Sequence, residues 1–506
     1  MLPKHTHRTV AALLGALLLL SGAPPTIAQL PQPEEKVVSA DDLVQIALTN
    51  NLDIKISRLQ PEIDQFALKG LYGAYQPNLT MNATRYFGLQ PGGIFSENGL
   101  EIPVPPTTTK SDNYTPGLSG YLPSGLTYNL SGPISYENIG GAETLKEYQA
   151  SPSINLDQPL LKGSWMNSAG YNISISRNTL RTDQWTFRLQ VMTVVFNVKT
   201  AYYKLIFARE NLKVQQEAVR LKDETVSEDK QKVKLGAMRP LDEQQAESEA
   251  ASARSDVQTA LVTLAQQENT MKSLLYQRLG DLDNFTFVPA EQLIAIPEHP
   301  QPQECFRIGL SERPEMVQAK LKIEKQHITI KYDFNQLFPQ IDVIGSYGRN
   351  ATDPTFDTTL GAIKNELSPN YLYGITMTIP LGNSSARGTY RADRAALQSL
   401  LLQAKKEEWV VVTAIDNDVK AIEADLLKVD YTRQARIFAE AALAAGQEEL
   451  KEGKRINFEV LQFQDNLTAA RSAEISALSD YNTALEQLAF DEGLTLERNH
   501  IDLHFR

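Results

Sequence analysis

The chain has 506 residues, of which 42% are hydrophobic and 22% are charged, so it can bury a large core. A mean hydropathy of −0.30 excludes a bundle of membrane-spanning helices. The formal net charge of −12 argues against nucleic acid or an anionic membrane surface as the main partner.

Residues 1–28 are predicted to form a secretory signal peptide. Lys4 and Arg8 precede an apolar stretch at residues 10–20, and a small-residue pattern ending at Ala28 permits cleavage. This stretch is too short to span a bilayer as a helix. We therefore expect an exported protein. Its single cysteine, Cys305, excludes an intrachain disulfide and is expected to be buried.

The remaining sequence contains an internal duplication. Residues 48–53 read LTNNLD and residues 310–315 read LSERPE, and prolines follow at Pro77 and Pro339. The offset is 262 residues at both points (310 − 48 and 339 − 77). A unit of roughly 220 to 260 residues is too large for a solenoid repeat, so we expect two halves of one pseudo-symmetric body. The halves are residues 29–280 and 303–506, joined by a linker at 281–302.

Each half contains a segment with the two-residue period of β-strands, at residues 78–158 and 340–380. Near the end of the second segment, apolar and aromatic residues alternate with small, polar and aliphatic ones; the former are Tyr371, Tyr373, Ile375, Met377 and Ile379. A soluble sandwich or a membrane barrel would both show this alternation. The first segment is longer, and the turn at residues 121–125 predicts an extra hairpin there.

Long helical hairpins are predicted at residues 172–278 and 387–488. Apolar residues recur every seven positions, which favours a left-handed supercoil; they include Val191, Val198, Leu205, Leu212, Val219, Val226 and Val233, then Ile415, Ile422, Val429, Leu443 and Leu450. The stretch from residue 172 to 235 would be about 95 Å long as one helix, which exceeds a globular domain of this size.

The hairpin turns are predicted at residues 236–240 and 453–457. Gly236 and Gly453 suit the left-handed position that ends a helix, and Pro240 suits the first turn of the next. The returning helices place small residues on the packing seam, which allows close approach; the seam residues are Ala246, Ala250, Ala253, Val257 and Leu261, then Leu467, Ala470, Ala477, Tyr481, Ala484 and Leu488.

Neither half has enough strands to close a barrel, and open strand edges are not viable in lipid, so a membrane barrel would require oligomerisation. The order of these features, duplicated at matched spacing, resembles the TolC-like family of outer-membrane efflux proteins. The resemblance is carried by the duplicated starts, Pro77 and Pro339, the Pro-Leu pairs at 159–160 and 380–381, and the two post-glycine turns.

The resemblance implies a fold dominated by α-helices with a membrane β-barrel part. In it, a homotrimer would form a long periplasmic α-barrel continuous with a β-barrel in the Gram-negative outer membrane. The implied function is a passive exit duct of a tripartite efflux or type I secretion system. Its implied partners are a periplasmic adaptor protein, an inner-membrane pump and outer-membrane lipid.

The resemblance also places a gate at the hairpin turns. Asp242 and Glu459 each stand six residues after their glycine (242 − 236 and 459 − 453), where family members often have acids at the closed entrance. In a trimer they would give six carboxylates around one constriction, with Arg239 and Arg455 as partners in inter-helix ion pairs that hold the mouth shut. The alternative interpretation is that an acid in the first turn of a helix simply complements the helix dipole.

The same turns would contact the adaptor through Gly236, Ala237, Gly453 and Lys454. Their sequences, LGAMRP and EGKRIN, differ from the Val-Gly-Leu type common in drug-efflux members, which leaves the adaptor class open.

An enzyme is not expected. The mature histidines form no metal-spaced pattern, and no GxSxG, P-loop or GxGxxG motif occurs. We expect no cofactor, no metal site and no nucleic-acid partner. The alternative to a channel is a secreted structural or adhesive coiled-coil protein with a soluble β-domain.

Overall fold

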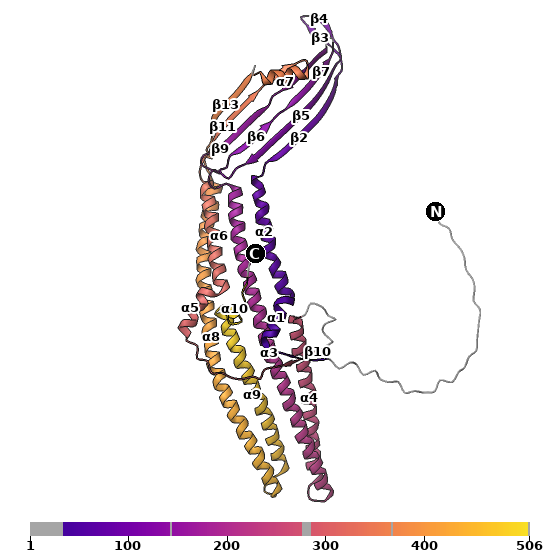
Figure 1. Ribbon diagram of the computed structural model, residues 1–506, viewed down its shortest axis with the longest axis vertical. Coiled ribbons are helices and arrows are strands. Elements are labelled where there is room, and N and C mark those ends of the chain that lie inside the picture. The colour runs from indigo at the N-terminus through magenta and orange to yellow at the C-terminus, as the bar shows by residue number, and fades with distance from the viewer. Residues whose placement is uncertain (1–33, 142–143, 276–284, 366–367, 504–506) are drawn as a thin grey trace, which may run out of the picture.

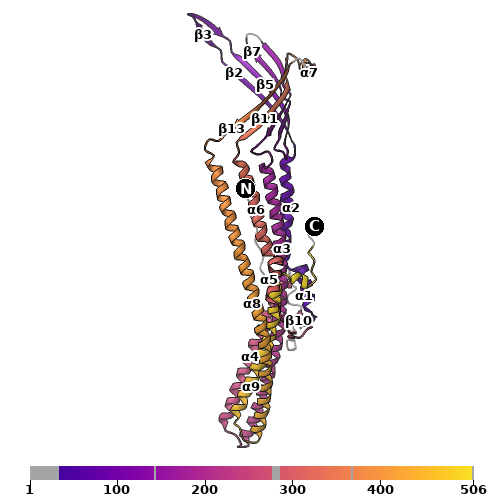
Figure 2. The same ribbon diagram turned by 90° about the vertical axis from the view of Figure 1, so that its left-hand side faces the viewer.

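The computed structural model describes residues 34–141, 144–275, 285–365 and 368–503, so the predicted signal peptide lies outside the described residues. The molecule is elongated, with a body of long helices below a curved sheet (Figures 1 and 2). No helix among the described residues is both long and apolar enough to cross a membrane.

Two helices extend through most of the helical body. They are α3 (Ser168–Lys234, 67 residues) and α8 (Ser384–Lys451, 68 residues), each about 100 Å long at 1.5 Å per residue. The returning helices of the hairpins are α4 (Pro240–Leu275) and α9 (Asn457–Asp491). The shorter helices are α1 (Ala40–Asn50), α2 (Leu52–Leu71), η1 (Tyr72–Tyr75), α5 (Pro302–Glu312), α6 (Pro314–Gln336), α7 (Phe356–Lys364) and α10 (Thr495–Arg498).

The helices form four rows at both levels of the body. Near the sheet, α2 packs on α3, α3 on α6 and α6 on α8; near the tips, α4 packs on α3, α3 on α9 and α9 on α8. Figure 1 shows both hairpins ending at the same lower end of the molecule. The duplicated halves therefore contribute two rows each at either level.

Both hairpin turns have the same backbone geometry. Gly236 and Gly453 each have φ of 73°, a conformation that costs glycine little. The N–H of Ala237 donates to the Lys232 carbonyl at 2.8 Å, and that of Lys454 to the Glu449 carbonyl at 2.9 Å, as in a Schellman motif. The local sequence at each glycine therefore determines where the hairpin turns.

Nine strands form the main sheet, and two further pairs form separate two-stranded sheets. The strands are β1 (Glu34–Val38), β2 (Asn78–Gln90), β3 (Gly93–Glu97), β4 (Leu100–Val104), β5 (Thr107–Tyr121), β6 (Thr127–Ser131), β7 (Ile134–Gly140), β8 (Thr144–Ala150), β9 (Ser153–Pro159), β10 (Phe285–Pro289), β11 (Gln340–Arg349), β12 (Ala351–Asp353) and β13 (Pro369–Thr378). The pair β3–β4 extends the β2–β5 hairpin, and β1 pairs in parallel with β10.

The nine strands of the main sheet make six long ribbons. The consecutive strands β6 and β7 both pair with the same edge of β5 and together form one ribbon. In the next ribbon β9 pairs with β6 and β8 with β7, and in the one after it β11 pairs with β9 and β12 with β8. Hydrogen bonds cross the interruptions, from the Gly132 N–H to the Pro116 carbonyl (2.9 Å) and from the Ser151 N–H to the Pro133 carbonyl (3.0 Å). The ribbon order is β2, β5, β6/β7, β9/β8, β11/β12 and β13.

The extra hairpin predicted from the turn at residues 121–125 is confirmed. That turn joins β5 to β6, and the Leu122 N–H donates to the Leu126 carbonyl at 2.8 Å. Four ribbons consequently come from the first half and two from the second. The short helix α7, between β12 and β13, was not predicted.

The two faces of the sheet differ in chemistry. One register row is apolar or aromatic in all six ribbons and consists of Leu79, Leu118, Leu130, Ile154, Tyr347 and Tyr371. The adjacent row, on the opposite face, is polar in five ribbons and consists of Asn78, Ser119, Asn129, Asn155, Ser346 and Leu372. Among the described residues nothing covers the apolar face at Leu79 and Tyr373, which are 81% and 84% exposed.

The core lies along the helix seams. Val191, Val198, Leu205, Ile415 and Ile422 are fully buried, as the seven-residue repeat predicts, and Cys305 is buried in α5. Leu261 was predicted to lie on the seam of α4, and this prediction is wrong. The buried residue is Ala260, whereas Leu261 is 41% exposed, because the spacing of three and four residues continues from Ala253.

In the lower part of α3, the residues Leu212, Val219 and Val226 are only half-buried. The buried positions there are instead Ala218, Lys222 and Asp229. The segment predicted as a linker also contains β10, whose pairing with β1 was not predicted.

Candidate pore gate at the hairpin tips

The first tip contains a local ion pair. The Arg239 guanidinium donates to both oxygens of Asp242, Nε to Oδ2 at 3.0 Å and Nη2 to Oδ1 at 2.9 Å. Asp242 lies in the first turn of α4 and its side chain is 19% exposed, whereas that of Arg239 is 74% exposed. The hydrogen bond to Asp242 raises the pKa of Arg239. The pair spans three residues, so it is local to its turn and is not the inter-helix ion pair expected for Arg239.

The second tip contains an ion pair that bridges two helices. Arg455 donates from Nε to Glu449 of α8 at 2.7 Å and from Nη1 to Glu459 of α9 at 3.3 Å. Its guanidinium lies 5.1 Å from the ring centroid of Phe463. That ring packs on Gly446, where an added Cβ would meet it at 2.7 Å. Glycine therefore allows α8 and α9 to approach closely above this tip.

The apical residues of both turns are accessible. Gly236, Ala237 and Gly453 are exposed, and the Lys454 side chain is 70% exposed beside Glu452 at 2.5 Å. The structure therefore brings each predicted arginine to the acid of its own tip, Arg239 to Asp242 and Arg455 to Glu459. It pairs none of these four residues across the two tips.

A buried contact that the sequence reasoning missed joins the hairpins just above the tips. Asn457, the first residue of α9, donates from Nδ2 to Oδ2 of Asp229 on α3 at 2.5 Å. Asp229 is 1% and Asn457 is 5% exposed. Burial raises the pKa of Asp229, and the bond from Asn457 partly opposes that shift. An isolated buried carboxylate would be costly, so this contact ties the position of one hairpin to the other.

A second contact lies further from the tips. Lys222 of α3, 5% exposed, reaches Glu249 of α4 at 3.1 Å and Asp465 of α9 at 2.6 Å. Burial lowers its pKa, but the bonds to Asp465 and Glu249 outweigh burial and raise the pKa overall. Between the two contacts, Gln464 donates to the Thr225 hydroxyl at 3.1 Å. Positions 218, 222, 225 and 229 continue the 3–4 seam spacing, which is the signal that could have identified them.

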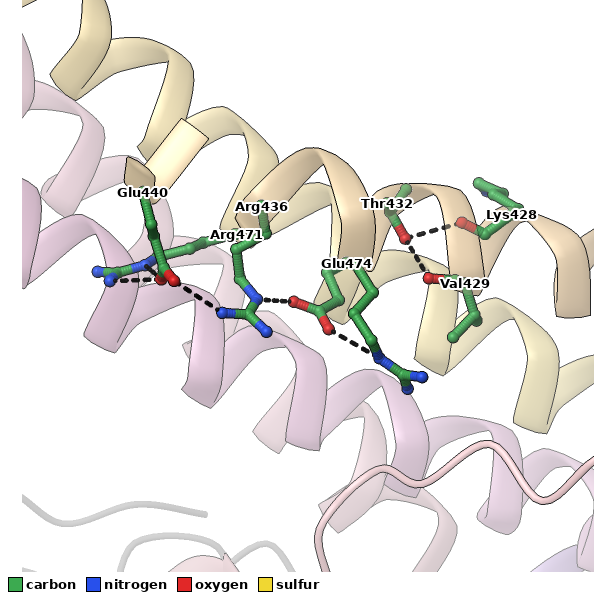
Figure 3. A network of polar contacts seen from close by, with 8 residues as sticks. Lys428, Val429, Thr432, Arg436, Glu440, Arg471 and Glu474 are labelled. Atoms are coloured by element: carbon green, nitrogen blue, oxygen red, sulfur yellow. Dashed lines mark hydrogen bonds and ion pairs between the residues drawn. The ribbon is translucent and has the colours of Figure 1, made fainter. Parts of the chain in front are cut away.

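Further along the second hairpin, ion pairs join α8 to α9 (Figure 3). Arg436 occupies the seven-residue repeat position between Val429 and Leu443. It bonds Glu474 of α9 and lies 3.1 Å from Glu440 on its own helix. Arg471 of α9 returns to Glu440 at 2.9 Å. This ladder holds the two helices of one hairpin together, whereas Lys222 and Asp229 join one hairpin to the other.

No group of three or more metal-ligating side chains occurs in the described part of the chain.

The helical hairpins and most of the sheet match a known protein family. The family model for outer membrane efflux proteins matches residues 129–275 and 308–490. The chain belongs to the outer membrane efflux protein family. It is therefore an outer-membrane efflux channel, and its location is the Gram-negative outer membrane. The relatives reported below are channels, which is consistent with the expectation that this protein is not an enzyme.

Individual relatives extend this likeness over most of the chain. The outer membrane efflux protein BepC of Brucella suis is 21% identical over 426 residues, covering 83% of this chain and 84% of BepC. The Campylobacter jejuni CmeC outer membrane channel aligns with a TM-score of 0.65 at 15% identity, covering 92% of this chain and 90% of CmeC. The open-state Neisseria gonorrhoeae MtrE channel aligns with a TM-score of 0.63 at 16% identity, covering 90% of this chain and 89% of MtrE. The helix-dominated fold is thus that of the outer membrane efflux channels.

Proposed function

We propose that this efflux channel acts as a homotrimer, in which three sheets form one outer-membrane β-barrel and twelve helical rows (three copies of four) form a periplasmic α-barrel. The observation that carries this proposal is the sheet itself, whose exposed apolar face needs lipid and whose edges need partners. The helical rows continue directly below the sheet in Figure 1 and would line one continuous duct.

The proposed mechanism is gated passive transport within a tripartite efflux or type I secretion system. A periplasmic adaptor protein, linked to an inner-membrane pump, binds the exposed tips at Gly236, Ala237, Gly453 and Lys454. Binding separates the hairpins, which requires the Asp229–Asn457 and Lys222–Asp465 contacts to break. Cargo then passes through the widened mouth without bond chemistry.

We propose that Asp242 and Glu459 line the mouth, with unequal effect. The Arg239–Asp242 pair is neutral, whereas Arg455 is shared by Glu449 and Glu459, so that group of three keeps one negative charge. The second tip should therefore contribute more to cation preference, because a ring of uncompensated carboxylates attracts cations.

The trimer is tested by cryo-electron microscopy of the detergent-extracted mature protein. A three-fold hollow tube with a helical barrel and a β-end in the micelle is the expected result. A monomer or a solid coiled coil would overturn the proposal.

The gate is tested by measuring reversal potentials in planar bilayers. We expect Glu459→Ala to lower the cation preference more than Asp242→Ala, and the double variant to lower it most. Glu224→Ala, an exposed acid on α3 twelve residues (236 − 224) or about 18 Å before Gly236, serves as the control and should change little. Unchanged selectivity in the double variant would overturn the gate proposal and would mean that both acids only complement the helix dipole.

A further inference from the structure

The ribbons of the sheet follow the same order as the helical rows beneath them. β2 follows α2, β9 precedes α3, β11 follows α6 and β13 precedes α8, and the rows run α2, α3, α6, α8. The remaining ribbons, β5 and β6/β7, lie between β2 and β9. Each copy therefore has six ribbons above four helical rows.

Both outer ribbons are free on one side. Among the described residues, β2 pairs only with β5 and β13 pairs only with β11. β2 runs away from the helices and β13 runs toward them, so the two edges are antiparallel. Their adjoining helices, α2 and α8, are also the outer rows near the sheet. A neighbouring copy that meets α8 with its α2 would bring its β2 beside β13.

The geometry points to an eighteen-stranded barrel (three copies of six ribbons), closed by pairing β13 of one copy with β2 of the next. This inference deepens the proposed trimer and rests on it. The occupant of each free edge is a second copy of this chain.

The widths of the two layers support this number. Strands about 4.8 Å apart and tilted by about 40° occupy about 6.3 Å of circumference each, so six ribbons span about 38 Å. Four helical rows at about 9 Å span about 36 Å. At the same tilt, a contribution of only four ribbons, two from each half, would span about 25 Å, less than the four helical rows.

The consequence is a wide exit. Eighteen strands give a backbone diameter of about 36 Å, against about 24 Å for twelve, and so about twice the cross-section. The β-barrel would then continue the bore of the helical tube, leaving the hairpin mouth as the narrow point. Such an exit suits bulky cargo as well as small molecules.

Disulfide cross-linking between copies tests the edge pairing. In a Cys305→Ala background, Leu79→Cys on β2 is combined in turn with Ile375→Cys and Met377→Cys on β13 and with Ile379→Cys just after its end. Ile375 and Met377 lie on the same face as Leu79, so the three pairs scan the register. Within one copy these edges are five strand spacings, about 24 Å, apart, so any disulfide must join two copies. We expect at least one pair to give covalent dimers and trimers on non-reducing gels.

Thr80→Cys with Met377→Cys is the matched control, because Thr80 points to the opposite face and should not cross-link. Strands are also counted in the cryo-electron microscopy map. A trimer that lacks all three cross-links and has a barrel of fewer than eighteen strands would overturn the inference but leave the channel intact. Absence of a trimer by native mass spectrometry would overturn the proposed assembly itself.

Discussion

Asn457 and Asp229 hold the two hairpins together at a point where neither residue can turn to water. We predict that Asn457→Ala weakens the contact between the two hairpins by about 1–3 kcal/mol, because it leaves a buried carboxylate without its donor. The expected result is faster amide hydrogen exchange at both tips and a higher single-channel conductance. Asn466→Ala, at an exposed position on the same helix, is the control. Identical exchange rates in the two variants would contradict the prediction.

We predict that Asp418 of α8 makes the stability of the helical body depend on pH. Burial, followed by the neighbouring Asp491, raises the pKa of Asp418 to about 8, while Arg313 opposes this and Glu492 adds to it. An acid whose pKa is raised in the folded state contributes stability at low pH that is lost as pH rises. Because its ordinary pKa is about 3.9, the loss should fall between about pH 4 and about pH 8.

The corresponding substitution is Asp418→Asn, which mimics the protonated acid. We predict that the melting temperature of the variant varies less with pH than that of the wild type and exceeds it at pH 9. Asp416→Asn, on a more exposed acid that pairs with Lys420, should keep the wild-type slope. If the melting temperatures of all three proteins changed equally with pH, this role for Asp418 would be contradicted.

At the scale of elements, small residues set the distance between the helices of a hairpin. Ala250 of α4 is 1% exposed, whereas its neighbour Ala251 is exposed. We predict that Ala250→Leu lowers the free energy of unfolding by about 1–3 kcal/mol through overpacking, while Ala251→Leu changes it little. Guanidinium unfolding in detergent, followed by circular dichroism, measures the difference. Equal midpoints would mean that α4 does not use this seam.

The sequence predicted those elements whose signals are local. Gly236, Gly453 and Pro240 specify the turns through backbone chemistry alone, and the apolar seven-residue repeat specifies the upper seams. The buried Lys222 and Asp229 were missed because their partners Asp465 and Asn457 belong to the other half of the chain. The β1–β10 pair was missed because Glu34 and Phe285 are 251 residues apart (285 − 34) and each strand has five residues.

On the scale of the whole molecule, the duplicated halves are equal in helices but unequal in strands. Both halves provide two helical rows, yet the first provides four ribbons and the second provides two. At about 6.3 Å per ribbon and about 9 Å per helical row, this asymmetry gives the sheet and the helical body similar widths. The orientation of the sheet faces then decides which side meets lipid.

The proposed barrel orientation is tested by moving one charge across the β13 backbone. Ile375 is 70% exposed on the apolar face, while its neighbour Thr376 faces the other side opposite Asp342. We predict that Ile375→Arg destabilises the inserted barrel by about 2–4 kcal/mol, since arginine at the membrane midplane is costly, whereas Thr376→Arg is tolerated in a wet lumen. The measurements are the amount of heat-resistant trimer in outer-membrane fractions and urea unfolding in vesicles. If the two substitutions had equal effects, the apolar face would not be the lipid-facing side.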